Sequence, residues 1–248
     1  YDGERQRLFC ARDRFGKKPL FFARRRDGLI FASECSALLR HPDLDPAVDR
    51  QAVLKFFAYG FLPSPWTLYK GVSKLPPGHT LSYDLSTGRL QQKCYWRYRI
   101  LPGEQPQGGP GEWAEELRHL LREAVGRRLE SDVPLGIFLS GGLDSTCIAV
   151  LAAEHLDASK LETFSIGFRE PSFDESSFAR DAAARLGTRH NERILELGQA
   201  TGLASDVLGR MDDPIADGSI LPTYLLSQLA AEKVTVALSG DGADELFA

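Results

Sequence analysis

The sequence predicts an α/β protein in which a β-rich amino-terminal part precedes a parallel-sheet α/β part. Short strand-like runs alternate with glycine-containing and charged turns over residues 5–33, which is typical of antiparallel hairpins. Residues 101–111 are rich in Pro, Gly and Gln, the composition of a linker. From Val133 onward strand-like and helix-like runs alternate, as expected for parallel strands joined by crossover helices. We therefore expect domains at 1–100 and 112–248, separated by the linker.

The first part is expected to contain five strands and two helices. Val53, Leu54 and Phe57 are spaced as on one face of a helix, which predicts a helix over Arg50–Tyr59. Ser33–Leu39 is expected to form a shorter helix. The strand-like runs, each bounded by turn residues, are Gln6–Ala11, Leu20–Arg24, Leu29–Ala32, 80–84 and 90–96.

The second part is expected to begin with a long amphipathic helix from Glu112. Its apolar stripe consists of Trp113, Leu117, Leu120, Leu121, Ala124 and Leu129. A helix over Phe173–Leu186 is expected to end at Gly187, because glycine commonly closes helices. Further helices are expected at Cys147–Leu156 and Ile220–Ala231, and the apolar, β-branched runs predict strands at 133–139, 162–168, 191–197 and 233–238.

The most informative stretch is VPLGIFLSGGLDST (133–146), in which an apolar strand stops at a glycine-rich loop and a helix follows. Gly141 and Gly142 allow backbone N–H groups to approach an anion closely. The N-terminus of the following helix offers unpaired N–H groups and a positive dipole. Ser140 and Ser145 add hydroxyl donors. The stretch therefore predicts a phosphate-binding loop, although a strand–turn–helix corner that uses the glycines only for its turn remains the structural alternative.

Commoner nucleotide-binding and hydrolase motifs are excluded. The sequence contains no Walker pattern, in which four residues separate a glycine from Gly-Lys-Ser/Thr. Gly240 and Gly242 lack the third glycine of the dinucleotide fingerprint. Neither Ser140 nor Ser239 lies in G-x-S-x-G. The SGGLDS loop instead resembles the pyrophosphate loop of ATP pyrophosphatases, which split ATP between its α and β phosphates.

A second glycine-rich loop, SGDGADELFA, follows the expected strand at 233–238 and carries Asp241, Asp244 and Glu245. Both loops follow expected parallel strands, and open α/β sheets bind ligands at the carboxyl ends of their strands. Together with Asp144, four carboxylates would then lie near one phosphate chain, which is unfavourable without a cation. We therefore expect Mg²⁺, which binds a few carboxylates together with substrate phosphates. A solvated acidic helix start is the structural alternative.

Composition excludes several other classes of function. With 43% hydrophobic residues the chain can bury a sizeable core, and its net charge of −4 offers no general attraction to nucleic acid or anionic lipid. The four cysteines are widely scattered without a C-x-x-C pair, so neither a zinc site nor a disulfide framework is indicated. This suits a reducing cytoplasm. No signal peptide and no run of eighteen apolar residues occurs, so we expect no membrane partner.

Several motifs follow one another in the order found in glutamine-hydrolysing asparagine synthetases, and the chain resembles that family over nearly its whole length. After VPLGIFLSGGLDST come ETFSIGF (162–168), LGTRHNE (186–192), PTYLLSQLA (222–230) and ALSGDGADELFA (237–248). Before it, LFCARDRFGKKPLFF (8–22), FASECSALL (31–39) and PPGHTLSYDLSTG (76–88) resemble the later half of the family's glutamine amidotransferase domain.

The resemblance implies the carboxyl-terminal part of an N-terminal-nucleophile-hydrolase-type β-rich layer domain, followed by a PP-loop domain of the adenine nucleotide α-hydrolase kind. Tyr1 and Ala248 both fall within expected elements, so we expect an interior fragment. The implied activity is an ATP-dependent amide ligase. It adenylates a carboxylate, L-aspartate in asparagine synthetases, with release of pyrophosphate, and glutamine-derived ammonia then displaces AMP.

The resemblance also assigns residues and cofactors. Positions matching the family's ATP and pyrophosphate contacts are Phe138, Ser140, Gly141, Gly142, Asp144, Ser145, Ile166, Ser239 and Gly240. Asp144 and Asp244 match its Mg²⁺ ligands. Asp241 matches a catalytic position at which many of these synthetases carry glutamate. The implied cofactors are ATP and Mg²⁺, and the implied partners are small molecules: ATP, the acceptor acid, and glutamine or ammonia.

In the first part, Asp13 matches the residue that holds the α-amino group of glutamine, with a solvated charged turn as the alternative. The family's glutaminase uses an amino-terminal cysteine, whereas residue 1 is Tyr1 and Cys10 lies within an expected strand. We therefore expect that the 248-residue chain does not hydrolyse glutamine. His190 is expected to be a hydrogen-bonded structural residue.

Three interpretations of function stay open. The shorter acid at Asp241, and Gly218 where a serine is usual, weaken the assignment of aspartate as acceptor; β-lactam-forming synthetases, peptide cyclases and other amidotransferases share the fold. The chain could instead be a truncated, catalytically silent protein that binds ATP-Mg²⁺, or an ammonia-using ligase without glutaminase function. The quaternary state is open, with a homodimer among the alternatives.

Overall fold

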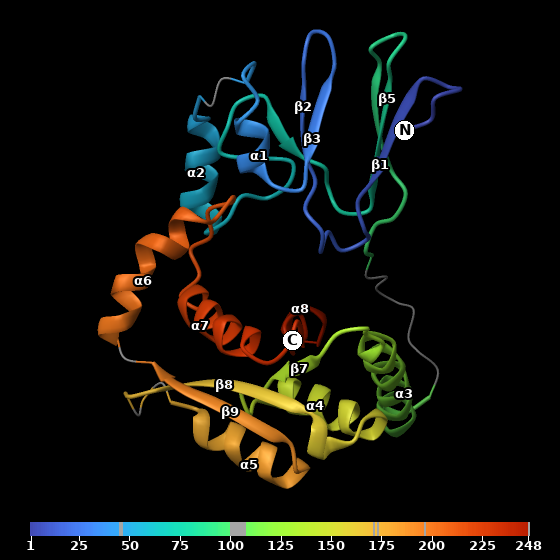
Figure 1. Cartoon of the computed structure of the whole chain (residues 1–248). Coiled ribbons are helices and arrows are strands. Elements are labelled where there is room, and N and C mark those ends of the chain that lie inside the picture. Colours follow the sequence, from blue (N-terminus) through green and yellow to red (C-terminus); the bar gives the residue numbers. More distant parts are fainter. Residues whose placement is uncertain (45–46, 100–107, 171, 173, 196, 248) are drawn as a thin grey trace. The chain divides into compact units, whose positions relative to one another are not determined.

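The computed structural model describes residues 1–44, 47–99, 108–170, 172, 174–195 and 197–247 (Figure 1). The chain divides into two compact units, Tyr1–Glu104 with Arg210–Asp217, and Gln105–Gly209 with Gly218–Ala248. Most of the expected linker, residues 101–107, lies outside the described residues. In the part of the chain that the structure describes, no helix combines the length and apolar character needed to cross a membrane.

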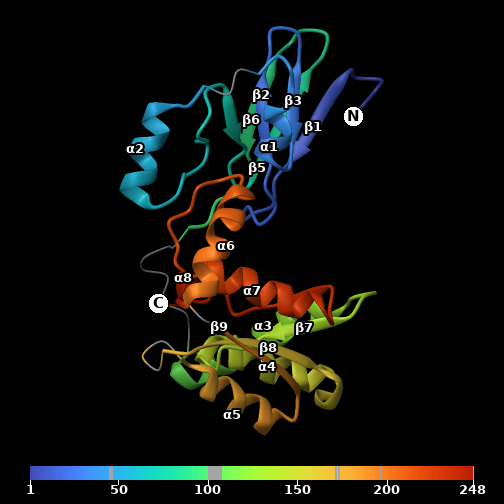
Figure 2. The same ribbon diagram turned by 60° about the vertical axis from the view of Figure 1, so that its left-hand side comes forward.

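The first unit contains two three-stranded antiparallel sheets. One has the order β1 (Arg7–Ala11), β5 (His79–Asp84), β6 (Leu90–Cys94), and the other the order β3 (Leu29–Ala32), β2 (Phe21–Arg24), β4 (Val72–Lys74). Two helices, α1 (Cys35–Leu39) and α2 (Arg50–Tyr59), complete the unit (Figure 2). The strands and helices expected from the sequence are confirmed within two residues at each end, and β4 is additional.

Strand β2 packs against α1 on one face and against the other sheet on the opposite face, because its successive side chains point to opposite sides. Phe21 and Ala23 pack in one buried cluster with Cys35 and Leu38 of α1. Phe22 packs in another with Leu81 of β5, so the two sheets lie face to face. The order of apolar residues in FFA therefore creates the two-layer core of this unit.

The second unit contains a four-stranded parallel sheet with the order β10 (Val236–Leu238), β7 (Leu135–Phe138), β8 (Glu162–Phe168), β9 (Arg189–Leu195). Helices α4 (Leu143–His155) and α5 (Ser176–Leu186) cover one face, and α7 (Ile220–Ala231) covers the other (Figures 1 and 2). The long helix α3 (Pro110–Leu129) packs against α4. The α/β class with a parallel sheet is thus confirmed.

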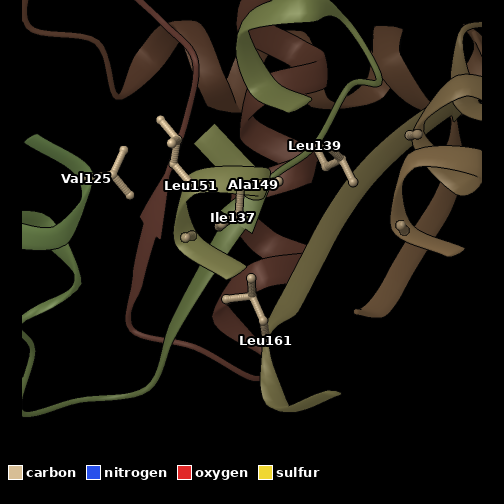
Figure 3. Close-up of a cluster of buried hydrophobic side chains, with 9 residues drawn as sticks. Val125, Ile137, Leu139, Ala149, Leu151 and Leu161 are labelled. Carbon is tan, nitrogen blue, oxygen red and sulfur yellow. The ribbon is translucent and has the colours of Figure 1, made fainter. Parts of the chain in front are cut away.

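Strand β7 is apolar throughout because both of its faces are covered. Ile137 and the following Leu139 lie in a buried cluster with residues of α3, α4 and α5 (Figure 3). Phe138 points the other way and packs beside buried Phe164, against α7. These contacts fix the end of β7, from which the SGGLDS loop departs.

Several details differ from the sequence expectation. Helix α4 begins at Leu143, four residues before the expected start at Cys147, and β10 begins at Val236, three residues after the expected start at 233. The expected start of α5 at Phe173 lies outside the described residues, and the helix is described from Ser176. Strand β9 begins two residues earlier than expected, at Arg189. In α3, the expected stripe residues Trp113, Leu117 and Leu120 are 41%, 39% and 53% exposed, and the carboxyl-terminal half of the helix makes the core contact. Helix α6 (Leu197–Gly209) was not expected, whereas the helix expected to begin within Asp241–Glu245 is confirmed as the short α8 (Asp244–Phe247). Gly187 closes α5 in the left-handed conformation, as predicted.

Candidate functional site

The two glycine-rich loops meet at one edge of the parallel sheet. Strands β7 and β10 are neighbours in parallel register, with Leu238 opposite Ile137, so both loops leave the sheet at the same end. A Cβ atom added to Gly240 would lie 2.8 Å from the backbone N of Ser145 and 3.0 Å from Cβ of Asp144. The expected convergence of the loops is therefore confirmed, and only glycine fits at Gly240.

Serine hydroxyls close the first loop on itself. Ser140 Oγ and Ser145 Oγ lie 2.9 Å apart, and Ser145 is buried. Ser145 Oγ also accepts from the backbone N–H of Ser140 at 3.2 Å, and Ser140 Oγ accepts from that of Gly142 at 3.2 Å. These bonds hold the loop in shape before any ligand is present, which is the preorganisation that an anion cradle requires.

Gly141 fastens the first loop to α5. Its φ is +84°, a conformation that residues other than glycine rarely adopt. A Cβ atom there would also lie 2.5 Å from backbone atoms of Phe178 and Ala179 in the first turns of α5. The loop consequently rests directly on that helix.

The amino-terminus of α4 opens beside the loop. Its N-cap, Gly142, has no side chain to cap the first turn. The first N–H groups of an α-helix have no partner within the helix and carry partial positive charge, so they suit an anion. Asp144, in this first turn, is half-buried. The arrangement can hold a phosphate, with Asp144 available to a cation bound to it.

Asp174, which does not stand out in the sequence, supports the first glycine loop through α5. Asp174 Oδ1 accepts from the backbone N–H of Phe168, at the end of β8, and from that of Ser176, at 3.1 and 3.2 Å. The buried Ser176 hydroxyl donates to Oδ2 at 3.0 Å. The N–H group of Phe168, followed by the Ser176 hydroxyl, lowers the pKa of Asp174. Asp174 thus ties α5, on which Gly141 rests, to the sheet. The signal in the sequence that could have revealed this role is an Asp two residues before the start of a helix.

The second loop is more exposed. Asp241 is exposed, and its carboxylate accepts from the Ser239 hydroxyl at 2.9 Å. Asp244 and Glu245 lie exposed in the first turn of α8. Within the described ranges, no group of three or more His, Cys, Asp or Glu side chains is arranged to hold a metal ion. The loop's acids are therefore not gathered into a site that could bind a cation unaided.

Phe138 and Ile166, the two strand residues matched to the family's ATP contacts, lie on the α7 side of the sheet. Half-buried Phe138 packs beside Phe164 and Leu226. Half-buried Ile166 packs against Leu195 and Leu225. Phe138 is the last residue of β7, from which the first glycine loop departs, and Ile166 lies in the carboxyl-terminal half of the neighbouring parallel strand β8.

His190 lies in a polar network on the α5 side of the sheet. Its Nδ1 is 3.1 Å from Thr163 Oγ1 and its Nε2 is 3.1 Å from Ser165 Oγ. Burial lowers the pKa of His190, while Glu192 acts in the opposite direction. The expectation of a hydrogen-bonded structural residue is confirmed.

In the first unit, Asp13 organises a tight turn. Its two carboxylate oxygens accept from the backbone N–H groups of Lys17 and Lys18, both at 3.0 Å, and the bond from Lys18 is the main reason its pKa is lowered. The Arg12 guanidinium donates to the carbonyls of Gly16, Lys18 and Leu75 at 2.9, 2.9 and 2.6 Å. The turn thus presents a half-buried carboxylate that is ionised at neutral pH.

Cys10 lies within β1, opposite Leu81 of β5, and burial raises the pKa of its thiol. A raised pKa leaves less thiolate, so Cys10 is a poor nucleophile. All four cysteines of the chain are free.

Fold and site together define an α/β protein whose parallel sheet carries paired glycine loops at its carboxyl edge, joined in one chain to a layered antiparallel unit. The chain belongs to the asparagine synthase family: the model of that family matches residues 116–248, and the model of a glutamine amidotransferase domain matches residues 1–96.

Full-chain relatives agree with this assignment. The chain is 37% identical over 249 residues to a Methanocaldococcus jannaschii protein provisionally named asparagine synthetase (glutamine-hydrolyzing) 2, covering 100% of this chain and 48% of the relative. It is 35% identical to asparagine synthetase (glutamine-hydrolyzing) 1 of Bacillus subtilis, covering 97% and 37% respectively. The amidase chyE of Penicillium rubens is 29% identical, with 100% and 38% covered. The chain thus spans about half the length of these relatives or less.

Among solved structures, an NH3-dependent NAD synthetase from Campylobacter jejuni matches 53% of this chain and 58% of its own, with 16% sequence identity and a TM-score of 0.38.

Proposed function

We propose that this chain forms part of a glutamine-dependent, ATP-consuming amide ligase of the asparagine synthetase kind. The observation that carries the proposal is the contact between the two glycine loops, seen at Gly240, in a chain of the asparagine synthase family. Loops at neighbouring strand ends can enclose one triphosphate, because both point their backbone groups into the same space.

The nucleotide would lie with its β and γ phosphates against the first loop. Backbone N–H groups of Gly141, Gly142 and the first turn of α4 supply donors, and the hydroxyls of Ser140 and Ser145 shape the loop. The adenosine would lie toward Phe138 and Ile166, and Ser239 and Gly240 would contact the nucleotide from the second loop. The Ser239 hydroxyl already donates to Asp241, so a contact to ATP would come from its backbone or require that bond to open.

Asp144 and Asp244 would hold Mg²⁺ together with phosphate oxygens. Two carboxylates would suffice for such an ion, because Mg²⁺ is usually bound by one or two carboxylates plus substrate phosphates rather than by a full protein cage. When bound, it would offset the charge of the phosphate chain and of the departing pyrophosphate.

The reaction would proceed in two displacements. A carboxylate oxygen of the acceptor attacks the α-phosphorus, the α–β bond breaks, and the electron pair leaves with pyrophosphate; donors of the first loop stabilise that charge. Ammonia then attacks the acyl carbon, loses a proton, and AMP leaves with the C–O electron pair. Asp241, exposed and hydrogen-bonded within the second loop, would accept that proton or orient ammonia.

Ammonia would come from glutamine bound at the Asp13 turn. There the ionised carboxylate of Asp13 would bind the α-ammonium group of glutamine. We expect no glutaminase activity from the 248 residues themselves, because Cys10 is held within β1. Glutamate release from glutamine by the purified chain would contradict this. The four free cysteines suit a reducing cytoplasm as the place of action.

L-aspartate is the acceptor we propose, on the family assignment. The similarity to a fungal amidase, and the short acid at Asp241, favour testing other carboxylic acids as a second candidate. Two alternatives remain: a catalytically silent protein that binds only ATP-Mg²⁺, and an ammonia-using ligase without glutaminase function.

Calorimetric titration with ATP, with and without Mg²⁺, tests the nucleotide site. Asp144→Ala should abolish the magnesium-dependent part of ATP binding, whereas Asp181→Ala should leave it unchanged. Asp181 is the matched control because its exposed side chain pairs with Arg185 on the surface of α5. Equal ATP affinity of wild type and Asp144→Ala in Mg²⁺ would refute the site.

Pyrophosphate release, measured with ATP, Mg²⁺ and ammonia, then separates the functions. Release that depends on aspartate supports the synthetase, and release with another acid identifies a different acceptor. Tight ATP binding without release for any acid would support the silent alternative.

A further inference from the structure

The segment between α6 and α7 packs with the first unit, although both helices belong to the second. Residues Arg210–Asp217 are part of the first unit. Ile215 forms an antiparallel bridge with Phe61, and the backbone N–H of Ala216 donates to the carbonyl of Gly60 at 2.7 Å. The segment is therefore fastened to the carboxyl-terminal end of α2.

Two neighbouring acids fasten the same segment at two more points. Asp212 Oδ1 accepts from the backbone N–H of Ser36, in the first turn of α1, at 3.0 Å. Asp213 forms an ion pair with Lys74, the last residue of β4. Cys35, beside Ser36, is buried, and its pKa is raised to about 11, first by burial and then by Asp212 and Asp213. These carboxylates thus lie close to the interior of the first unit.

Lys74 depends on Asp213 for charge balance. Its side chain is only 9% exposed, and its Nζ also donates to the carbonyl of buried Leu62 at 2.7 Å. A buried ammonium is unfavourable unless an opposite charge and hydrogen bonds compensate it, and removing one partner of such a pair leaves the other uncompensated. Asp213 therefore holds Lys74, and with it β4, in place.

From Lys74 the contacts continue to the Asp13 turn. Leu75 follows Lys74, is fully buried, and donates its N–H to the carbonyl of Leu20 at 2.8 Å. Its own carbonyl accepts from Arg12 Nη1 at 2.6 Å. Arg12 in turn donates to the carbonyls of Gly16 and Lys18 in the turn that presents Asp13. Asp213 also acts electrostatically on Arg12, opposing the effect of burial on its pKa.

We infer that Asp213 and Lys74 are positioning residues for the Asp13 turn: the segment 210–217 fastens β4, and β4 presents the Leu75 carbonyl that holds Arg12. The consequence for glutamine rests on the proposed function of Asp13. A displacement of the α6–α7 connection would then move Asp13 through the polar contacts of Asp213 with Lys74 and of Leu75 with Arg12. Asp213 itself would not contact glutamine.

The experiment uses the 248-residue chain and three variants. Asp213→Asn removes the charge at nearly constant shape, Asp213→Glu keeps it, and Asp27→Asn changes an exposed acid of the β2–β3 turn in the same unit. Amide hydrogen exchange is followed for residues 12–18, and alkylation of Cys35 is followed by peptide mass spectrometry. Saturation-transfer NMR measures glutamine binding, and calorimetry measures ATP binding.

Asp213→Asn should speed exchange in residues 12–18 and alkylation of Cys35 by about tenfold, the scale of one uncompensated buried interaction. Glutamine affinity should fall by about fivefold or more, since a ligand's affinity follows the population of the competent turn, while ATP affinity stays unchanged. Asp213→Glu should restore most of the wild-type behaviour, and Asp27→Asn should change nothing.

Three results would overturn the inference: unchanged exchange at residues 12–18, exchange that rises uniformly over the whole first unit, or faster exchange of the turn with unchanged glutamine affinity. If wild type binds no glutamine but Asp213→Asn still loosens the turn selectively, the positioning role stands and the glutamine assignment of Asp13 falls.

Discussion

The two glycine loops reach the same edge of the sheet but are supported very differently. The first, Ser140–Ser145, is closed by its own serine hydroxyls and rests on α5, which Asp174 ties to β8. The second, Ser239–Glu245, is largely exposed and begins a helix of four residues. The first loop is thus held in shape by its own hydrogen bonds and by the fold, and we propose that the second gains order from the nucleotide and its cation.

This difference suggests a division of labour within the proposed site. A cradle held by the core can bind phosphate without paying for its own ordering. A loop carrying Asp241 and Asp244 can adjust as the acceptor and ammonia arrive. Substitutions that weaken the support of the first loop should therefore reduce ATP affinity. Substitutions in the second loop should mainly lower the rate of the chemical steps.

The largest effect is expected at Gly141. Gly141→Ala forces a side chain into a positive-φ position against the backbone of Phe178 and Ala179, which should destabilise the fold by about 2–4 kcal/mol. ATP affinity should fall by about 100-fold. Gly187→Ala, at the carboxyl-terminal end of α5, is the matched control, because φ is also positive there, +74°, but no atom lies within 4 Å of the new Cβ. Urea unfolding measures the free energy of unfolding, and calorimetric titration measures the ATP affinity. Similar losses of ATP affinity in the two variants would contradict a role of the first loop in phosphate binding.

A smaller effect is expected at the contact between the loops. Gly240→Ala would push the second loop away from Ser145 and Asp144, so ATP affinity should fall by about tenfold with little loss of stability. Gly242→Ala is the comparison, because it also has positive φ, +93°, but open space around the new Cβ. The same assays apply. If Gly242→Ala lowered ATP affinity more than Gly240→Ala, the loss of affinity would come from backbone strain and not from the contact between the loops.

Asp174 tests the support of the first loop alone. Asp174→Asn keeps the shape but weakens the bonds to Phe168 and Ser176, and should reduce ATP affinity by about three- to tenfold. Because the folded-state pKa of Asp174 is lowered, its stabilisation is present above the ordinary value of 3.8 and is lost as pH falls through the folded-state value. Thermal unfolding between about pH 5 and 2.5 should be less pH-dependent in the variant. An identical pH profile in both proteins would contradict this role.

The smallest effect is expected at His190, whose ring contacts Thr163 and Ser165 of β8. Its pKa is lowered by burial, so the unfolded chain gains a proton more readily, and stability should decline as pH falls below the ordinary value of 6.5. The decline levels off below the folded-state pKa. His190→Gln should flatten that part of the stability curve and change ATP affinity by less than about twofold. A large loss of ATP affinity would instead assign His190 to the site.

Local sequence predicted most elements closely. The bounds of α2, β8 and α7 agree with the expectation to the residue. Strand β9 was shifted because its polar first residues, Arg189 and His190, lack the apolar pattern by which a strand is recognised. Helix α6 was missed because Gly198 and Gly202 interrupt its helical pattern, and glycine has low helix propensity.

The candidate site was only partly predictable. The glycines, serines and acids of both loops stand out in the sequence, because phosphate and cation binding need those residue types at strand ends. The supporting residues do not stand out. Asp174, Lys74 and Asp213 are ordinary charged residues until their partners are known, and the partner of Asp213 lies more than a hundred positions earlier in the chain.

The sequence by itself determined most of the strands, the two glycine loops and the family, since periodicity and loop chemistry are properties of short stretches. Only the tertiary structure decided that β10 lies beside β7, that Gly141 rests on α5, and that residues 210–217 return to the first unit. The physical reason is that strand order and buried charge pairs depend on contacts between distant segments, which no local pattern encodes.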